Sequence, residues 1–591
     1  MSKTSARART WFLFALALAH GIATTASTLT PTVHTTNGTL VGVRNTQYEQ
    51  DFFLGIPYAQ PPVGKLRYRR PRPVAQTWGE RRDATEYGAG CYAAPVPLPV
   101  FDQQGVSYAE SEDCLTLNVV RPAGVDKADT KLPVLVWIHG GGFSEGNSAD
   151  QRYNISFLVR ESVDVGAPVI GVTINYRLSG FGFLPGSRLN RTGVANLGLY
   201  DQRLALGWIQ DNIAAFGGDP SRVTLQGESA GAISVGHQFL AFGGRDDGLF
   251  RAGIMQSGGV GAGAPFLPEE AQDIAYNRVL NETGCTSSKD TLDCLREVPV
   301  DRLRAAFQGM EYFPSIDGDL VGEHPAVDLD AGRFVRRPIL TGTNTNEGTA
   351  FTIVEDLFPQ TTTDFRAAMA RYLRPGTPNT TLDVIAADYL NNMSSEEAQL
   401  ALGTVLPSSN PAYGALYGRA TIFRGDQLFM AARRYSTETW ARYGVPAYSY
   451  RFDVVPSGVD ARTLGVSHFA EVPFVFHNLD GVGHDINFLA SDFPAEREAL
   501  VRLSGRMSRM WLSFVNELTP NSHYSLAQDV LSYLSVDTYL AAGGKGQVPR
   551  WPIYSNRSKV NMLFRKEGVS LERDDWRASA IRRLNDVDLL A

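Results

Sequence analysis

A serine within a run of small residues is the strongest chemical feature of this sequence. The pattern Gly227-Glu228-Ser229-Ala230-Gly231 occurs once in the chain. It follows an apolar stretch at 223–225 and precedes small residues that can begin a helix. A serine on a sharp strand-to-helix turn is the nucleophile elbow of α/β-hydrolases, and the following helix N-terminus favours negative charge nearby. We therefore interpret Ser229 as a nucleophile and not as an incidental turn serine.

A second glycine-rich loop could stabilise the negative charge that attack by a serine creates. His139-Gly140-Gly141-Gly142-Phe143 directly follows an apolar run that ends at Ile138. Consecutive glycines leave backbone N–H groups free to point into a site, and together with the N–H of Ala230 they could form an oxyanion hole. A phosphate-binding loop is disfavoured because no Lys-Ser/Thr pair follows. We expect His139, at the head of the loop, to be structural.

The general base should be a histidine on a loop after a late strand. Beyond the N-terminal leader, the chain has eight histidines: His34, His139, His237, His324, His468, His477, His484 and His523. The chain order Ser, acid, His selects those after Ser229. His468 lies in a short turn led by Gly465, after the strand expected at 447–452. The residues alone favour His468 and leave His477 and His484 open.

The acid that orients the histidine should also lie at the end of a strand. Glu347 lies in the loop 343–348, just after an expected strand at 338–340. Asp453, which directly follows the strand at 447–452, is the alternative. Asp317, in Asp317-Gly318-Asp319, is typical of a turn.

These residues need a parallel sheet to bring them together. Short apolar runs at 134–138, 169–174 and 223–225 predict buried parallel strands, and further strands are expected at 252–255, 338–340 and 447–452. Leu206, Ile209, Ile213 and Phe216 form one apolar face of a helix at 199–216. The alternation predicts an α/β fold with a large, mostly parallel sheet covered by helices. The stretches 262–330 and 352–440 are expected to be helical and loop-rich insertions that wall the site.

The N-terminus is typical of a secretory signal peptide. Lys3, Arg7 and Arg9 precede the apolar run 11–19, and small residues follow up to Ala26. The apolar run is too short to span a bilayer, so we expect residues 1–26 to be removed. Residues 27–591 are then expected to form one domain. No later segment has the length of apolar sequence that a transmembrane helix needs.

Secretion affects the interpretation of charge and of sequence motifs. Loss of the leader changes the formal net charge from −7 to −10. An acidic surface gives no reason to expect a nucleic-acid partner. Asn-x-Ser/Thr glycosylation motifs begin at seven positions: Asn37, Asn154, Asn190, Asn281, Asn379, Asn392 and Asn556.

Four cysteines, Cys91, Cys114, Cys285 and Cys294, suggest disulfides in a secreted chain. Three pairings are possible, of which the local one joins Cys91 to Cys114 and Cys285 to Cys294. The chain lacks Cys-x-x-Cys and paired-histidine spacings, so a metal site is not expected.

The chain as a whole resembles the type-B carboxylesterase/lipase family, which includes cholinesterases and fungal lipases. The resemblance covers nearly all of the chain after the leader and is carried by four motifs besides the serine pattern: Phe53–Pro62, Glu112–Val119, Asn175–Leu178 and Phe216–Pro220. It implies an α/β-hydrolase fold and hydrolysis of carboxylic esters without a cofactor.

The resemblance also assigns roles to single positions. Ser229 matches the nucleophile, Glu347 the acid and His468 the base, because the family pattern asks for a sequence like Val472–Phe476 after the histidine. Gly141, Gly142 and Ala230 match the oxyanion donors. The cysteines match two local disulfides of fungal members, Cys91–Cys114 and Cys285–Cys294.

One departure from the family bears on the substrate. The segment between Cys91 and Cys114 is shorter than the amphipathic lid of family lipases, and Pro95, Pro97 and Pro99 oppose a helix there. It also lacks the tryptophan with which cholinesterases hold choline. We therefore expect a hydrolase of small or medium soluble esters. An interfacial lipase and a biosynthetic esterase or acyl transferase are the alternatives, and a non-catalytic adhesion protein is disfavoured because every catalytic position is intact.

Overall fold

The structure is a computed structural model of the 591-residue chain. It describes residues 30–95, 97–99, 101, 108–125, 131–263, 266–403, 405, 413–522 and 548–586. The expected leader, 1–26, and the candidate histidine His523 lie outside the described residues.

An eleven-stranded sheet forms the centre of the molecule. Its order is β16-β15-β14-β13-β12-β11-β9-β10-β8-β4-β3. The strands from β15 to β10 in this order run parallel, and antiparallel strands complete both ends. Their bounds are β3 Val43–Asn45, β4 Gln50–Pro57, β8 Thr116–Pro122, β9 Leu132–Ile138, β10 Ile170–Ile174, β11 Gly218–Glu228, β12 Ala252–Gln256, β13 Ile339–Asn344, β14 Ala447–Phe452, β15 Val560–Arg565 and β16 Gly568–Arg573.

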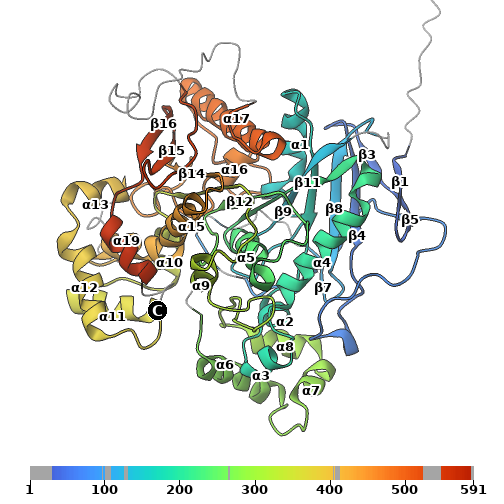
Figure 1. Ribbon diagram of the computed structural model, residues 1–591, viewed down its shortest axis with the longest axis horizontal. Helices are drawn as coiled ribbons and strands as arrows, with labels where there is room; N and C mark the ends of the chain where they lie inside the picture. Colours follow the sequence, from blue (N-terminus) through green and yellow to red (C-terminus); the bar gives the residue numbers. More distant parts are fainter. Residues whose placement is uncertain are drawn as a thin grey trace, which may run out of the picture.

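Side chains alternate between two apolar cores, one on each face of the sheet. In β9, Val134, Val136 and Ile138 join the core beneath α4 (Leu197–Asn212) and α5 (Ala230–Gly244). Leu135 and Trp137 point to the opposite core, beneath α1 (Ile155–Asp164) and α17 (Pro494–Glu517). Helices α1 and α17 lie side by side in Figure 1. Burial on both faces explains why the strands are continuous apolar runs.

The expected fold is confirmed, with differences at the ends of elements. All six expected strands are present, and β11 is much longer than the apolar run that predicted it. The helix predicted at 199–216 begins two residues earlier and ends as a 3₁₀ turn at Ile213–Phe216. Its four apolar residues, Leu206, Ile209, Ile213 and Phe216, are fully buried.

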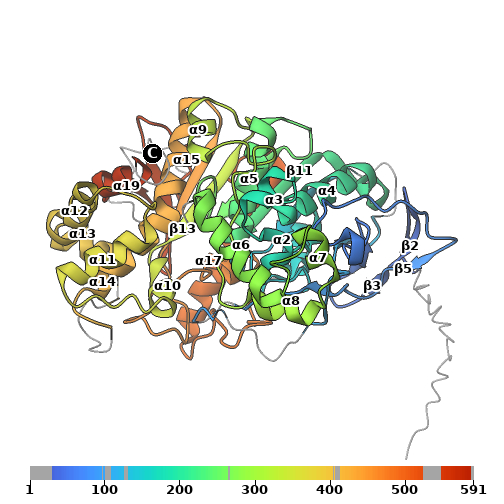
Figure 2. The same cartoon turned by 90° about the horizontal axis from the view of Figure 1, so that it is seen from below.

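The two expected insertions are helical. The first carries α6 (Glu269–Thr283), α7 (Thr291–Glu297), α8 (Val300–Phe307) and α9 (Pro325–Asp330). The second carries α11 (Thr362–Tyr372), α12 (Asn379–Ala387), α13 (Ser395–Leu402), α14 (Tyr417–Gly425) and the start of α15 (Ala431–Arg442). Helices α11 to α14 form one end of the molecule and share an apolar core with α19 (Ala578–Leu584) (Figure 2).

Smaller elements complete the fold. A three-stranded sheet of β1 (Thr32–Thr35), β2 (Gly38–Val41) and β5 (Arg82–Asp83) lies at the end opposite α11–α14 (Figure 2). Strands β6 (Gly90–Cys91) and β7 (Glu110–Ser111) pair beside the disulfide Cys91–Cys114, and the second disulfide joins Cys285 to Cys294. The short helices are α2 (Ser179–Phe183), α3 (Ser187–Arg191), α10 (Gly348–Val354) and α16 (Val472–Val475). Within the described ranges, no helix combines the length and apolar character required to cross a membrane.

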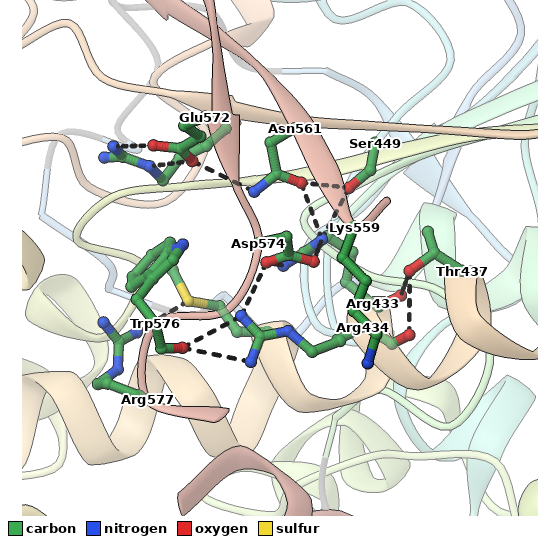
Figure 3. Close-up of polar contacts among 12 residues, drawn as sticks. Arg433, Arg434, Thr437, Ser449, Lys559, Asn561, Glu572, Asp574, Trp576 and Arg577 are labelled. Atoms are coloured by element: carbon green, nitrogen blue, oxygen red, sulfur yellow. Dashed lines mark hydrogen bonds and ion pairs between the residues drawn. The ribbon is translucent and has the colours of Figure 1, made fainter. Parts of the chain in front are cut away.

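A buried ion cluster ties α15 to the C-terminal strands (Figure 3). Asp574 is fully buried after β16, and its oxygens accept bonds of 2.8 Å from both terminal nitrogens of Arg433. Arg434 adds a bond of 2.7 Å and the Tyr554 hydroxyl one of 2.8 Å. Burial alone would raise the pKa of Asp574, but the two guanidinium groups hold it well below its ordinary value. The carboxylate therefore stays ionised and is the shared counter-ion of two buried cations.

Removing this charge should destabilise the protein strongly. Asp574→Asn keeps the shape of the side chain but leaves Arg433 and Arg434 without their buried anion, which costs about 3–5 kcal/mol in comparable cases. Urea unfolding monitored by fluorescence measures the loss. The neighbouring Asp575 is exposed, so Asp575→Asn is the matched control and should change the unfolding free energy by less than about 0.5 kcal/mol. Similar small losses in both variants would show that the cluster contributes little.

Candidate active site

Ser229 occupies a strained turn between β11 and α5. Its backbone has φ 55° and ψ −126°, a conformation that non-glycine residues rarely adopt. Its N–H donates to the carbonyl of Gln256 in β12 at 2.9 Å. Its carbonyl accepts the N–H of Ile233, and this hydrogen bond closes the first turn of the helix. The surrounding sheet and helix thus hold the strained residue at the carboxyl end of the sheet.

The flanking glycines are required because strand and helix approach each other closely. A Cβ on Gly227 would overlap the backbone of Gly231, and one on Gly231 would overlap the carbonyl oxygen of Ile138 in β9. The neighbours of the serine in the motif must therefore be small, as its pattern predicts.

The glycine loop after β9 lies against this elbow. A Cβ on Gly140 would overlap the carbonyl oxygen of Glu228 and come within 3.0 Å of the Ser229 Cβ. Gly141 and Gly142 have φ of 95° and 59°, and the Gly141 carbonyl accepts the N–H groups of Ser144 and Glu145. The N–H groups of Gly141, Gly142 and Ala230 donate to no carbonyl of the described residues. The three N–H groups are therefore available as donors, which the predicted oxyanion hole requires.

His139 does not face the serine. Its ring is fully buried and stacks on Tyr176 with centroids 4.5 Å apart, and Nδ1 lies 3.0 Å from the carbonyl of Gly140. Burial lowers its pKa to about 4, which keeps the ring neutral. The structural role predicted for His139 agrees with this position.

Glu347 and His468 meet at the ends of β13 and β14. Oε2 of Glu347 lies 2.7 Å from Nδ1 of His468. The other oxygen, Oε1, accepts the hydroxyl of Ser257 and the N–H of Asn344, each at 2.6 Å. With Nδ1 donating to the carboxylate, Nε2 is the ring nitrogen that can accept a proton.

Nε2 of His468 points at the elbow. It lies 3.2 Å from Oε1 of Glu228, the residue before Ser229, and makes no hydrogen bond to the serine hydroxyl. Catalytic hydrogen bonds are often long in ligand-free enzymes and tighten when substrate binds. The structure thus brings His468, Glu347 and the backbone of Ser229 to one place.

Buried carboxylates surround the imidazole. Glu228 is 1% exposed, and burial raises its pKa well above its ordinary value. Glu471 is fully buried, bonded to the amides of Gln256 at 3.1 Å and Asn344 at 2.7 Å, and burial likewise raises its pKa. Burial alone would lower the pKa of His468, but Glu228, Glu347 and Glu471 together outweigh it and raise the pKa to about 9.

Two aromatic rings pack against the imidazole ring of His468. Phe429 stacks on His468 with centroids 4.6 Å apart and planes 15° apart, and Phe351 of α10 meets the ring edge-on at 5.1 Å. Phe429 lies in a π-helical turn, Asp426–Met430, between α14 and α15. The ring is therefore fixed in orientation by packing as well as by Glu347.

The alternatives left open by the sequence lie elsewhere. His477 bonds to Ser504 at 2.9 Å, and His484 packs against Phe488. Asp453 bonds to Thr345 at 2.6 Å and to Arg565 at 2.9 Å, not to His468. Asp317 accepts the N–H groups of Asp319 and Val321, as a turn residue does.

Sequence reasoning missed most of the surrounding cluster. Ser257, Glu471 and Phe429 were not singled out, and Glu228 was treated only as part of the serine pattern. Glu471 offered one usable signal: it is a carboxylate in the otherwise apolar run from Phe469 to Val475, and it is fully buried there. Ser257 and Phe429 carry no local signal, because their contacts come from distant segments.

In its described residues, the segment after Cys91, here called the cover segment, forms no helix and packs beside this site. Leu98 is buried against Ala350 of α10 and Leu464 of the loop before His468. Phe101 packs edge-on against Phe469 at 4.9 Å, and Arg152 lies 4.3 Å above the Phe101 ring. The cover segment is therefore attached to α10, which follows Glu347, and to the loop that carries His468.

In the part of the chain that the structure describes, no three histidine, cysteine or acidic side chains are grouped so that they could hold a metal ion.

The sheet, the elbow and the oxyanion loop define an α/β-hydrolase. The chain belongs to the carboxylesterase family, whose family model matches residues 29–575, and it is a carboxylic-ester hydrolase. It is 33% identical to Secreted lipase 1 of Botryotinia fuckeliana, over 93% of this chain and 92% of that protein. It is 35% identical to the secreted triacylglycerol lipase LIP1 of Gibberella zeae, over 76% of this chain and 78% of that protein. The crystal structure of Aspergillus niger EstA superimposes with a TM-score of 0.78 at 26% identity, over 95% of this chain and 99% of EstA.

The carboxylates around His468 lead to a prediction about pH dependence. A base must be unprotonated to act, so kcat/KM should rise with pH through a pKa above the ordinary histidine value of about 6.5. Glu228→Gln removes the carboxyl group whose charge interaction raises the pKa of His468, so this rising limb should move to lower pH. Rates on a soluble ester across pH measure the shift. Glu161→Gln, a buried carboxylate paired with Arg509, is the control. An unchanged limb in Glu228→Gln would mean that Glu228 does not face the working base.

Proposed function

We propose that the protein hydrolyses esters through an acyl-enzyme formed on Ser229. His468 removes the hydroxyl proton as the serine attacks the ester carbonyl, and returns a proton to the departing alcohol. Glu347 holds Nδ1–H and stabilises the charged ring. The N–H groups of Gly141, Gly142 and Ala230 receive the oxyanion. Water then repeats the sequence to release the acid.

One observation carries this proposal: the short contact between Glu347 and His468, with Nε2 directed at the elbow. It combines with the strained serine and the three unused N–H groups in a single site. Of the histidines within the described ranges, only His468 meets a carboxylate on one side and the elbow on the other.

We also propose that the protein is secreted after cleavage behind Ala26. Relatives are named as secreted proteins, which supports this proposal. Four of the glycosylation motifs, at Asn281, Asn379, Asn392 and Asn556, have exposed asparagines and are proposed as glycan sites. The amides of Asn37, Asn154 and Asn190 are half-buried and donate to protein atoms.

For the substrate, we propose small or medium soluble esters. The contacts of Leu98 and Phe101 favour a cover that keeps one position, and Pro95, Pro97 and Pro99 stiffen the sequence on both sides of Leu98. A lid that opens at a lipid surface usually swings as an amphipathic helix, for which this segment is unsuited. The second candidate is an interfacial lipase, favoured by the names of the relatives.

The catalytic roles can be tested by labelling and substitution. An organophosphate should modify Ser229 and abolish activity, and Ser229→Ala should fold normally but take no label. His468→Ala should slow turnover about as much as Ser229→Ala, since triad members act as a unit. Glu347→Gln should cost orders of magnitude, while Asp453→Asn, the matched acidic control, should retain most activity if it folds. A label on Ser257, or a mild effect of Glu347→Gln beside a crippling Asp453→Asn, would contradict the assignment.

The substrate proposal predicts simple kinetics. Rates on short-chain esters should saturate smoothly below the solubility limit and show no jump above it, because a fixed cover needs no surface to open. Initial rates measured with soluble and emulsified esters decide this point. A sharp increase on emulsified long-chain triglyceride would favour the lipase candidate.

A further inference from the structure

A buried ion pair ties the turn that carries Phe429 to the C-terminal part of the chain. Asp426, the first residue of the π-helical turn Asp426–Met430, is fully buried. Nε of Arg577 donates to its Oδ2 at 2.7 Å, and Nη2 donates to its Oδ1. The Tyr389 hydroxyl donates to Oδ2 at 3.0 Å. Arg577 lies directly before α19 and its side chain is 3% exposed, so both charges are removed from solvent.

The π-helical turn depends on contacts outside its own helix. A turn of this kind is rare by itself and often lies at a functional site. Here it joins α14 to α15 in one continuous helical stretch. Nη2 of Arg577 also donates to Sδ of Met430, the last residue of the turn, at 3.1 Å. Arg577 therefore binds the first and the last residue of the turn, and can hold its wider geometry in place.

The same turn packs against the proposed base and the proposed acid. Between its two ends, Phe429 stacks on His468 with centroids 4.6 Å apart. Gly425, directly before the turn, lies against the acid, because a Cβ on Gly425 would come within 3.3 Å of the Glu347 Cβ. A displacement of the turn would therefore move groups that contact both residues.

The stacked ring has two effects on the imidazole. It blocks rotation of the ring, so that Nε2 keeps its direction. Its π face also favours the protonated form, since a cation is attracted to the face of an aromatic ring. Loss of the stack should therefore slow turnover and lower the pKa of His468.

The charge of Asp426 does not explain such effects directly. The carboxyl groups whose charges act most strongly on His468 are those of Glu228, Glu347 and Glu471. An influence of Asp426 on the base should therefore be transmitted through the position of the turn.

We propose that Asp426 is a positioning residue for His468: bound to Arg577, it holds the π-helical turn where Phe429 stacks on the imidazole. It acts through Phe429 and not by contact with the reacting atoms. The residues just before α19 thereby support the base from a distant part of the sequence. This inference rests on the proposed role of His468 and adds a support for that role.

The test measures kcat, KM and the pH dependence of kcat/KM on a soluble short-chain ester, per organophosphate-reactive site, so that only folded enzyme is counted. Asp426→Asn should lower kcat roughly ten- to a hundredfold, as a small misplacement of a catalytic group does, and leave KM nearly unchanged. The rising limb should move to lower pH by about half a unit to one unit. Phe429→Leu should lower kcat and move the limb in the same way. In the double variant the losses should not add, because both substitutions act at one contact.

Asp388→Asn is the matched control. Asp388 is buried and begins a second π-helical turn, Asp388–Asn392, and it accepts Nε of Arg583 in α19 at 2.7 Å. This turn packs against α12, α14 and α19 and does not carry the ring that stacks on His468. Asp388→Asn should therefore leave kcat and the rising limb unchanged.

Asp426→Asn leaves Arg577 buried without its anion, which can prevent folding. Asp426→Leu combined with Arg577→Met removes both charges, which usually costs less stability, and should show the same kinetic changes. Unchanged kcat and pH dependence in these variants, losses that add to those of Phe429→Leu, or equal changes in Asp388→Asn would overturn the inference. Failure of the proposed function would appear separately, as high activity in His468→Ala.

Discussion

The active site depends on a backbone conformation that only very close packing can maintain. Ser229 has a positive φ without being a glycine, and the strain is balanced by hydrogen bonds to β12 and to the first turn of α5. That packing leaves no room for a Cβ at Gly227, Gly231 or Gly140. The same absence of side chains brings the oxyanion loop to the serine. The strain at Ser229 and the position of the glycine loop beside it are therefore consequences of one close approach between β9, β11 and α5.

The electrostatics of the site follow from burying one imidazole among three glutamates. Isolated buried carboxylates would be strongly disfavoured, and each is stabilised by specific donors or by the imidazole itself. Glu347 has the Ser257 hydroxyl and a backbone N–H, and Glu471 has two amides. Glu228 faces Nε2 of His468. In the proposed mechanism, the positive charge on His468 forms among carboxyl groups that are already oriented, and little reorganisation is needed.

The sequence was informative where local structure decides the outcome. Apolar runs predicted the strands, and the small residues around Ser229 predicted the elbow, because both follow from contacts between near neighbours. The base and the acid needed the family resemblance, since residues alone left His477, His484 and Asp453 open. Ser257, Glu471 and Phe429 could not be predicted: they reach the site from three separate segments, and only the folded sheet brings those segments together. The contacts of the cover segment could not be predicted either. The spacing of its prolines indicates a stiff segment but not which residues that segment packs against.

The cover segment and His468 both pack against α10. This helix begins directly after Glu347, carries Ala350 beneath Leu98 of the cover and places Phe351 against the His468 ring. The loop before His468 supplies Leu464 to the same contact, and Thr349 of α10 donates its hydroxyl to the Leu464 carbonyl. A displacement of the cover would therefore disturb the packing around both the acid and the base. The cover segment therefore supports the geometry of Glu347 and His468, which favours a cover that stays in place during turnover.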